Sequence, residues 1–424
     1  MTSFRFVHTA DTHIDSPLRG LAGQQGAAAD RIRRATRDAF DNLISQAIDA
    51  AVSFVIIAGD IYDGDWRDYQ TGLFFVGEMG RLNKAGIPAF LLYGNHDAES
   101  KITRHLSLPE NVSAFSAMKP QTFELKELRV ALHGQSFRQR DTTEDFVPAY
   151  PGPTPGMFNV GVLHTGLGGM GGHANYAPCT LEELISKGYD YWALGHVHQG
   201  CILHERPFVV FPGALQGRHI REAGPKGAYL VTVEEGEVTE LAQLQADTVR
   251  WALVHVSLGG CERMADVAEG IRGAIEEAAE NCGDGQLVAM RVELDGRTDL
   301  HGELLASTEW VLAEARAAAA GLGEEAAWVE RVMFSTEPSA ENEAARGRED
   351  AVGELQRLLA DASKDADLLE QLRADIGEFV GRLPHEIRAT SDDTLIEAAV
   401  GGAYADLIGI MEDYLTARIT SETE

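Results

Sequence analysis

The sequence has 424 residues, of which 24% are charged and 44% hydrophobic, and its formal net charge is −30. This length exceeds one ordinary core and predicts two or three domains. No apolar run is long enough to cross a bilayer and the first residues look like a strand, so we expect a cytoplasmic protein without a membrane partner. The four cysteines form no Cys-x-x-Cys pair, which argues against a cysteine zinc site.

The negative charge is concentrated in the second half of the chain. Residues 1–250 carry 22 basic against 29 acidic side chains (net −7), and residues 251–424 carry 14 against 37 (net −23). Because phosphate backbones attract basic surfaces, this charge weakens a nucleic-acid interpretation. It does not exclude one, since bound metal would cancel several acids of the first half.

Short apolar runs alternate with helical patterns through residue 200, which is typical of an α/β fold with buried strands. Strands are predicted at residues 4–9, 54–58, 88–93, 130–133, 160–164 and 191–194. Between the first two strands, apolar residues recur every three or four positions from Ile32 to Ala51, which predicts one buried helix face. Four prolines within residues 148–156 predict a surface loop.

From Trp251 the pattern predicts a smaller α/β domain with three strands and two helices, and after Ser335 an acidic, alanine-rich helical tail. The apolar faces of the tail comprise Leu368, Leu369, Leu372, Ile376, Phe379 and Val380 in one helix, and Leu395, Ile396, Val400, Leu407, Met411 and Leu415 in another. We therefore expect three regions, at residues 1–248, 249–336 and 337–424.

Residues of the types that bind metals lie at the carboxyl ends of predicted strands, where α/β folds place their active sites. They are Asp11, His13, Asp60, Asn95, His96, Asp97, His164, His196 and His198. Singly, such an aspartate is often a helix cap, a histidine a core residue and an asparagine a turn residue. Caps and turns have no reason to choose histidine at several strand ends, so together these residues favour a metal site.

This ligand set suits a pair of divalent cations that cleave a phosphate ester. Water is a poor nucleophile and the ester's negative charge repels attack. Two cations about 3.5–4 Å apart lower the pKa of a bridging water and neutralise the phosphoryl oxygens. The pair needs one carboxylate that bridges, and imidazoles and an amide oxygen can complete the ligand shells. The sequence therefore predicts a two-metal phosphoesterase.

The chain resembles the calcineurin-like metallophosphoesterases, whose ordered signature is Asp-x-His, Gly-Asp, Gly-Asn-His-Asp, His and Gly-His-x-His. Within that superfamily, the segments FRFVHTADTHIDSPLRG, LLYGNHD, HTGLGGMGGHANYAPCTLEEL, ALGHVHQG and VFPGALQGRHIREAGPKG resemble the SbcD and YhaO-like DNA repair exonucleases. The resemblance implies an α/β fold: a four-layer sandwich of two mixed sheets flanked by helices, with a small α/β capping domain and a helical C-terminal tail.

The resemblance also implies a role for each matching residue. The first metal would be held by Asp11, His13, Asp60 and His198, and the second by Asp60, Asn95, His164 and His196. A metal-activated water would attack phosphorus, while His96 stabilises the transition state or protonates the leaving oxygen and Asp97 orients His96. These mixed nitrogen and oxygen ligands suit Mn²⁺, with iron, zinc or magnesium as alternatives.

Less specific patterns suggest contacts to nucleic acid. The glycine-rich segment 166–172 precedes His173 and Tyr176, and the segment 213–221 contains Arg218, His219 and Arg221. Two further histidines, His8 and His133, lie in predicted strands, and we expect them to support the core or the ligands rather than bind metal.

Three functions remain open from the sequence. The leading hypothesis is a DNA repair exonuclease whose tail binds a coiled-coil ATPase of the SbcC type, although the apolar stripes of the tail would equally suit packing on the protein's own body. A homodimer is also open. The second is a phosphodiesterase or phosphatase acting on a cyclic nucleotide, nucleotide or phosphoprotein, which the acidic charge favours. The third is a non-catalytic scaffold of a repair complex, against which the intact His96 and ligand set argue.

Overall fold

The computed structural model describes residues 3–16, 27–63, 69–99, 107–170, 175–283, 285–323, 325–339, 351–383 and 394–421. The chain divides into two compact units. The first comprises Met1–Ala252, Asn281–Ala289 and Glu324–Trp328, and the second comprises Leu253–Glu280, Met290–Gly323 and Val329–Glu424. The regions that we expected as a capping domain and a helical tail therefore both belong mainly to the second unit.

The first unit contains two six-stranded sheets. The order in the first sheet is β12 (Glu237–Gln245), β11 (Gly227–Glu234), β1 (Ser3–Thr9), β2 (Phe54–Ala58), β3 (Ala89–Leu92) and β4 (Val112–Ala114). The order in the second is β5 (Gln121–Leu125), β6 (Val130–Gly134), β7 (Phe158–His164), β8 (Tyr191–Gly195), β10 (Phe208–Phe211) and β9 (Cys201–Glu205). Both sheets combine parallel central strands with antiparallel strands at an edge.

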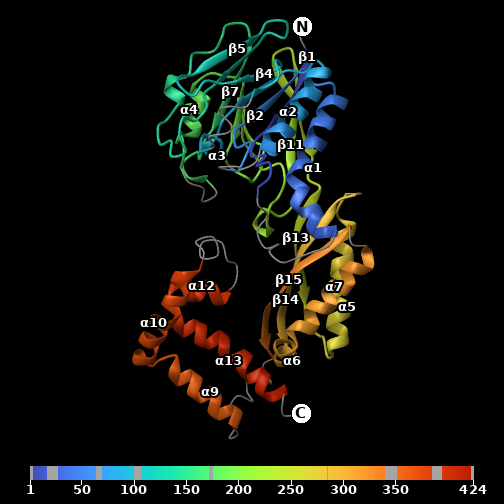
Figure 1. The fold of residues 1–424 in the computed structure, drawn as a ribbon, viewed down its shortest axis with the longest axis vertical. Coiled ribbons are helices and arrows are strands. Elements are labelled where there is room, and N and C mark those ends of the chain that lie inside the picture. The colour runs from blue at the N-terminus through green and yellow to red at the C-terminus, as the bar shows by residue number, and fades with distance from the viewer. Residues whose placement is uncertain are drawn as a thin grey trace. The chain divides into compact units, whose positions relative to one another are not determined.

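Layers form because the central strands are apolar on both faces. In β2, Val55 and Ile57 pack in the core beneath α1 (Ala27–Asp49) and α2 (Tyr69–Lys84), while Phe54 and Ile56 pack between the two sheets. The outer face of the second sheet packs on α4 (Leu181–Ser186) through Trp192. Figure 1 shows α1 and α2 on one side of the sheets and α4 on the other. The expected four-layer sandwich of mixed sheets is confirmed.

Three more short helices lie in the described part of the first unit. They are α3 (Asn95–Glu99), η2 (Val147–Ala149) and η4 (Ile220–Glu222). The first of these begins directly after β3, so the Gly-Asn-His-Asp motif forms a strand-to-helix turn. The predicted loop at residues 148–156 is irregular apart from the start, which lies in η2.

A three-stranded sheet, β13 (Val249–Ser257), β14 (Leu287–Thr298) and β15 (Ala327–Pro338), starts in the first unit and runs into the second. The described helices of the second unit are α5 (Met264–Glu280), α6 (His301–Ala306), α7 (Thr308–Leu322), α9 (Ala351–Ala362), α10 (Ala366–Arg382), α12 (Thr394–Gly401) and α13 (Tyr404–Ser421). Helix α5 packs against α7, and α13 packs against α6 and α9.

The predicted apolar face of α10 remains partly open to solvent. This helix lies wholly within the described residues and has no buried side chain, and Phe379 is 63% exposed. Within the described residues, the other five apolar side chains of that face are partly buried, so the face is only partly covered. Among the described helices, none is both long and apolar enough to span a membrane.

Candidate metal centre

The loops after β1, β2 and β8 carry candidate ligands. Backbone hydrogen bonds join the first two loops, and the His196 amide, after β8, donates to the Asp11 carboxylate at 2.9 Å. The amide of Asp11 donates to the Gly59 carbonyl (3.0 Å), and the amide of His13 donates to the Asp60 carbonyl (3.1 Å). Asp11, His13, Asp60 and His196 have positive φ angles of 49°, 40°, 51° and 104°. Non-glycine residues rarely adopt this conformation, and such strain clusters at functional sites because the surrounding structure must enforce it.

Asp60 lies at the centre of the site. Its Oδ1 accepts a hydrogen bond from the His96 amide (3.0 Å), and its Oδ2 lies 3.3 Å from His164 Nε2 and 4.0 Å from His13 Nε2. The backbone of Gly94 approaches so closely that a Cβ there would stand 2.3 Å from Asp60 Oδ1. The glycine of the Gly-Asn-His-Asp motif is therefore required by this approach. Asp60 is within reach of two groups of histidines, as a bridging carboxylate must be.

Asp11, His13 and His198 form the first triad. The Nε2 atoms of His13 and His198 are 3.1 Å apart, and His198 Nε2 lies 3.9 Å from Asp11 Oδ1. Two ligand atoms at about 2.1 Å from one ion and at a right angle to each other would lie about 3.0 Å apart. The two imidazoles thus point at one place, and their spacing fits a shared cation.

Asp60, His164 and His196 form the second triad, and Asn95 adjoins it. His164 Nε2 lies 3.0 Å from Asn95 Oδ1, while its Nδ1 faces the Ala58 carbonyl oxygen at 2.9 Å. That carbonyl accepts the Nδ1 proton, so Nε2 keeps the lone pair that a metal needs. The donor set of carboxylate, amide oxygen and two imidazoles fits a second divalent cation.

Burial and mutual repulsion perturb the titration of these groups. Burial raises the pKa of Asp11 to about 8. Burial and the charge of Arg218 lower the pKa of His13 to about 3. Although burial alone would lower it, the Asp60 carboxylate raises the pKa of His164 to about 9. The metal-free centre therefore retains protons where a cation would supply positive charge.

His96 is the accessible histidine of the centre, with a side chain 30% exposed. Its Nδ1 lies 3.3 Å from Asp63 Oδ1, and the same oxygen lies 3.4 Å from His13 Nδ1. Ser16 Oγ donates to the other oxygen of Asp63 at 2.9 Å. Sequence reasoning missed Asp63. The available signal was its position three residues after Asp60 on the same loop.

Asp97, which we expected to orient His96, has other partners. Its Oδ2 accepts hydrogen bonds from the amides of Ile61 (3.2 Å) and Gly94 (2.9 Å), and its Oδ1 accepts one from the amide of Tyr62 (3.0 Å). The side chain therefore joins the loop after β2 to the loop after β3. The carboxylate beside His96 is that of Asp63, so the geometry differs from the expected pairing.

Glu222 is a second carboxylate that the sequence did not reveal. Its Oε1 lies 2.6 Å from His198 Nδ1, and its Oε2 accepts a hydrogen bond from the Arg218 amide at 2.8 Å. Burial would raise the pKa of Glu222, but the hydrogen bond from His198 and the charge of Arg218 hold it below its usual range. His219 Nε2 also lies 3.7 Å from Glu222 Oε1. Arg218 and His219, expected to contact nucleic acid, thus stand beside the first triad.

The remaining expected nucleic-acid contacts are dispersed. The ring of Tyr176 stands 5.6 Å from the ring of His196, so it borders the second triad. Arg221 is exposed, and His173 lies outside the described residues.

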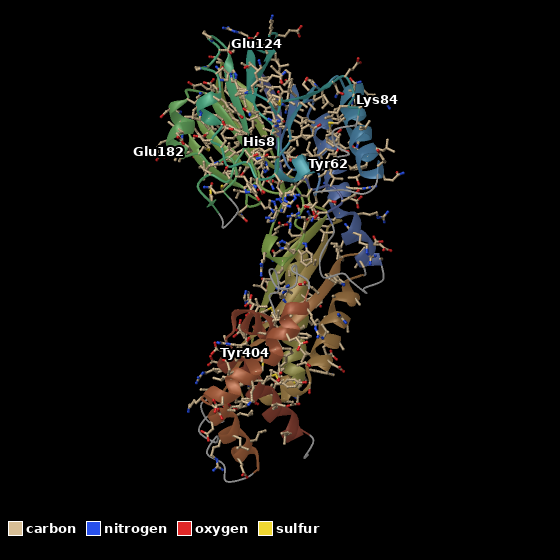
Figure 2. All side chains as sticks on the ribbon, turned by 60° about the vertical axis from the view of Figure 1, so that its left-hand side comes forward. His8, Tyr62, Lys84, Glu124, Glu182 and Tyr404 are labelled. Atoms are coloured by element: carbon tan, nitrogen blue, oxygen red, sulfur yellow. The ribbon has the colours of Figure 1, made fainter. Side chains whose placement is uncertain are left out.

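The two strand histidines lie in the interior, as expected. His8 is fully buried between Tyr191 Oη (3.0 Å) and the Leu194 carbonyl (3.1 Å), and Figure 2 shows it inside the sandwich. His133 contacts the Asn159 and Thr122 side chains.

The profile of the calcineurin-like phosphoesterase family matches residues 4–200, and the profile named "Metallophosphoesterase YhaO, middle domain" matches residues 251–337. The chain is 33% identical over 300 residues to the uncharacterized metallophosphoesterase YhaO of Bacillus subtilis (strain 168). The aligned region covers 70% of this chain and 72% of that protein. The chain belongs to the calcineurin-like metallophosphoesterase family.

Two further similarities are more distant. The chain is 26% identical over 270 residues to the DNA double-strand break repair protein Mre11 of Haloferax volcanii, covering 63% of this chain and 58% of that protein. A dimetal phosphatase from Danio rerio has a TM-score of 0.36 and 13% identity, covering 55% of this chain and 94% of that chain.

Family membership confirms the expected class of enzyme. This metallophosphoesterase is a hydrolase of phosphoric esters, which disfavours the scaffold hypothesis. The family implies divalent cations, and the triads provide clusters of residues suited to hold them.

Proposed function

We propose that this metallophosphoesterase is a metal-dependent DNA repair nuclease that removes nucleotides from DNA ends. The observation that carries the proposal is the convergence of two ligand triads on either side of Asp60. The similarity to a protein named for DNA double-strand break repair supports DNA as the substrate.

The two cations would be held by residues that share Asp60. The first would take Asp11, His13, Asp60 and His198, and the second Asp60, Asn95, His164 and His196. Mixed imidazole, carboxylate and amide ligands suit Mn²⁺. When bound, two divalent cations lower the pKa of a water molecule and neutralise phosphoryl oxygens.

His96 would serve the leaving group. Because Asp63 lies beside its Nδ1, Nε2 is the ring nitrogen available to the substrate. A proton held on Nε2 would pass to the leaving oxygen as the phosphorus–oxygen bond breaks. The guanidinium of Arg218, beside the first triad, adds positive charge that favours binding of a phosphate group. Tyr176, His219 and Arg221 are the described residues that we assign to contacts with the nucleic-acid strand.

We further propose that the helical tail binds a coiled-coil ATPase of the SbcC type. The partly exposed apolar face of α10 supports this, because apolar helix faces serve as docking surfaces for partner helices. Replacing both Ile376 and Phe379 with glutamate should abolish copurification with the ATPase. The same substitution at Met118, 71% exposed in the first unit, should not. Unchanged copurification of the α10 variant would overturn this assignment.

A small phosphodiester or phosphomonoester is the alternative substrate for the same site. The net charge of −30 favours it, because an acidic protein repels a DNA backbone. A cyclic nucleotide, a nucleotide or a phosphoprotein would each avoid most of that repulsion.

The deciding experiment uses the full chain with Mn²⁺, alone and with the partner ATPase. Its substrates are end-labelled linear DNA, single- and double-stranded, closed circular DNA and a chromogenic phosphodiester. Degradation of linear but not circular DNA, lost in Asp60→Asn, is the expected result. Hydrolysis of the chromogenic ester without cleavage of any DNA would replace the nuclease with the alternative.

A further inference from the structure

The carboxylate of Glu222 contacts His198, a histidine of the first triad, on the ring nitrogen that faces away from the proposed metal position. Glu222 is buried, and its Oε1 lies 2.6 Å from Nδ1 of His198, whose Nε2 points toward His13. The other oxygen of Glu222 accepts the amide hydrogen of Arg218 at 2.8 Å. The carboxylate is thus fixed by the backbone of its own segment while it contacts the ring.

Arg218 links the Glu222 carboxylate to the carboxylate of Asp63, which lies beside His13 Nδ1. Its guanidinium lies 3.3 Å from Glu222 Oε1 and 3.7 Å from Asp63 Oδ1, and it donates to Ser16 Oγ at 3.2 Å. Both histidines of the first triad therefore have a carboxylate beside Nδ1, and the positively charged Arg218 guanidinium lies between these two carboxylates.

The second triad lacks this arrangement at His164. There the group facing Nδ1 is the neutral carbonyl of Ala58, at 2.9 Å. A carboxylate that accepts the Nδ1 proton makes an imidazole a stronger ligand than a carbonyl does, and it also restrains the rotation of the ring. The first triad further has its own carboxylate, Asp11, in addition to the central Asp60, whereas the second is completed by the neutral amide of Asn95.

We propose that Glu222, held by Arg218, is a positioning residue that orients His198 and gives the first triad the higher affinity for a divalent cation. The inference rests on the proposed function insofar as both triads bind cations. It adds that the two positions fill in order, the first triad before the second, and that one residue outside the ligand set determines this order.

The test measures uptake of Mn²⁺ directly, by titration calorimetry and equilibrium dialysis of the metal-free full chain. The wild type should take up two ions with separable affinities. Glu222→Ala should weaken the tighter phase about 10–100-fold and leave the weaker phase unchanged. Glu222→Gln keeps an acceptor oxygen for His198 and should weaken the tighter phase less than about tenfold. Glu124→Ala, an equal change of charge on β5, should bind as the wild type does.

Two ligand variants assign the phases. His164→Ala should retain the tight phase and His13→Ala should lose it. Adding Glu222→Gln to His164→Ala should weaken the single remaining phase. Unchanged tight binding in either Glu222 variant, or a loss confined to the weaker phase, would overturn the inference while leaving the proposed function intact. A wild type that takes up no ion would overturn both, and if Glu222→Ala does not fold, the glutamine variant decides alone.

Discussion

Replacing Asp97 with asparagine should destabilise the first unit as well as impair the metal centre. The carboxylate accepts three backbone amide hydrogen bonds, at 2.9 to 3.2 Å, and Asp97 as a whole is 2% exposed. Asparagine offers one acceptor oxygen and a second group that is itself a donor. Whichever way the amide is turned, at least one buried backbone amide would face a donor instead of an acceptor.

The expected loss of stability follows from the number of backbone amides that lose their acceptor. A buried donor left without a partner costs about 1–3 kcal/mol. For a domain of this size each kcal/mol lowers the thermal midpoint by about 2–4 °C, so we expect a fall of about 2–12 °C. Replacing Asp97 with alanine would leave three buried amides without an acceptor, at a cost of about 3–9 kcal/mol. That cost approaches the total stability of about 5–15 kcal/mol, so asparagine is the more informative substitution.

Asp63→Asn is the matched control, because it makes the same chemical change where the neighbours are side chains. Its asparagine oxygen can still accept from Ser16, so we expect a small change of midpoint but turnover lower by about 10–100-fold. Calorimetry of the full chain gives the midpoints, and hydrolysis of a chromogenic diester gives turnover. An Asp97→Asn protein that melts like the wild type but turns over as slowly as Asp63→Asn would refute this reasoning.

Three further outcomes are expected. His96→Gln should lower turnover by about 10²–10⁴-fold, and measured Mn²⁺ uptake should not change, since the proposed role of His96 is to protonate the leaving group. The apparent affinity for Mn²⁺ should rise from pH 6.5 to 8. Burial raises the pKa of Asp11 to about 8, and the Asp60 carboxylate, acting against burial, raises the pKa of His164 to about 9. Metal binding must therefore displace protons, and calorimetry in two buffers can count them. Gly94→Ala should abolish Mn²⁺ uptake, because its Cβ would stand 2.3 Å from Asp60 Oδ1; normal uptake would contradict the close approach.

The sequence predicted most of the strands that are buried on both faces, although β10, Phe208–Phe211, was missed despite its apolar residues. Strand β2 is apolar throughout and was predicted to the residue, and β7 and β8 were found within two residues of their ends. The missed strands lie mostly at or near sheet edges. Strand β12, Glu237–Gln245, has no buried residue, and β5 and β9 are similar. Their polar composition lacks the apolar run that identifies a buried strand, and only pairing with a neighbour makes them strands.

The candidate ligands could be picked out from the sequence because each lies at or shortly after the carboxyl end of a strand. Supporting residues were not, because their contacts join segments that are distant in the chain, as with Glu222 and His198, 24 residues apart. The role of Asp97 illustrates a second limit. Adjacent residues on a helix do not face each other, so in α3 the side chain next to His96 in sequence turns toward the backbone of another loop.

Charge explains why these supporting residues occur together. Within the described residues of the centre, the carboxylates of Asp11, Asp60, Asp63 and Glu222 are buried or largely buried, and the guanidinium of Arg218 lies near those of Asp63 and Glu222. Uncompensated charges in such a place cost several kcal/mol each, so this excess of negative charge is stable only with added positive charge. Without bound cations, protons supply it: burial and, to a lesser extent, repulsion from Asp60 raise the pKa of Asp11. Two divalent cations would supply it without protonating the ligands, so this buried cluster of carboxylates suits the chemistry of a metallophosphoesterase.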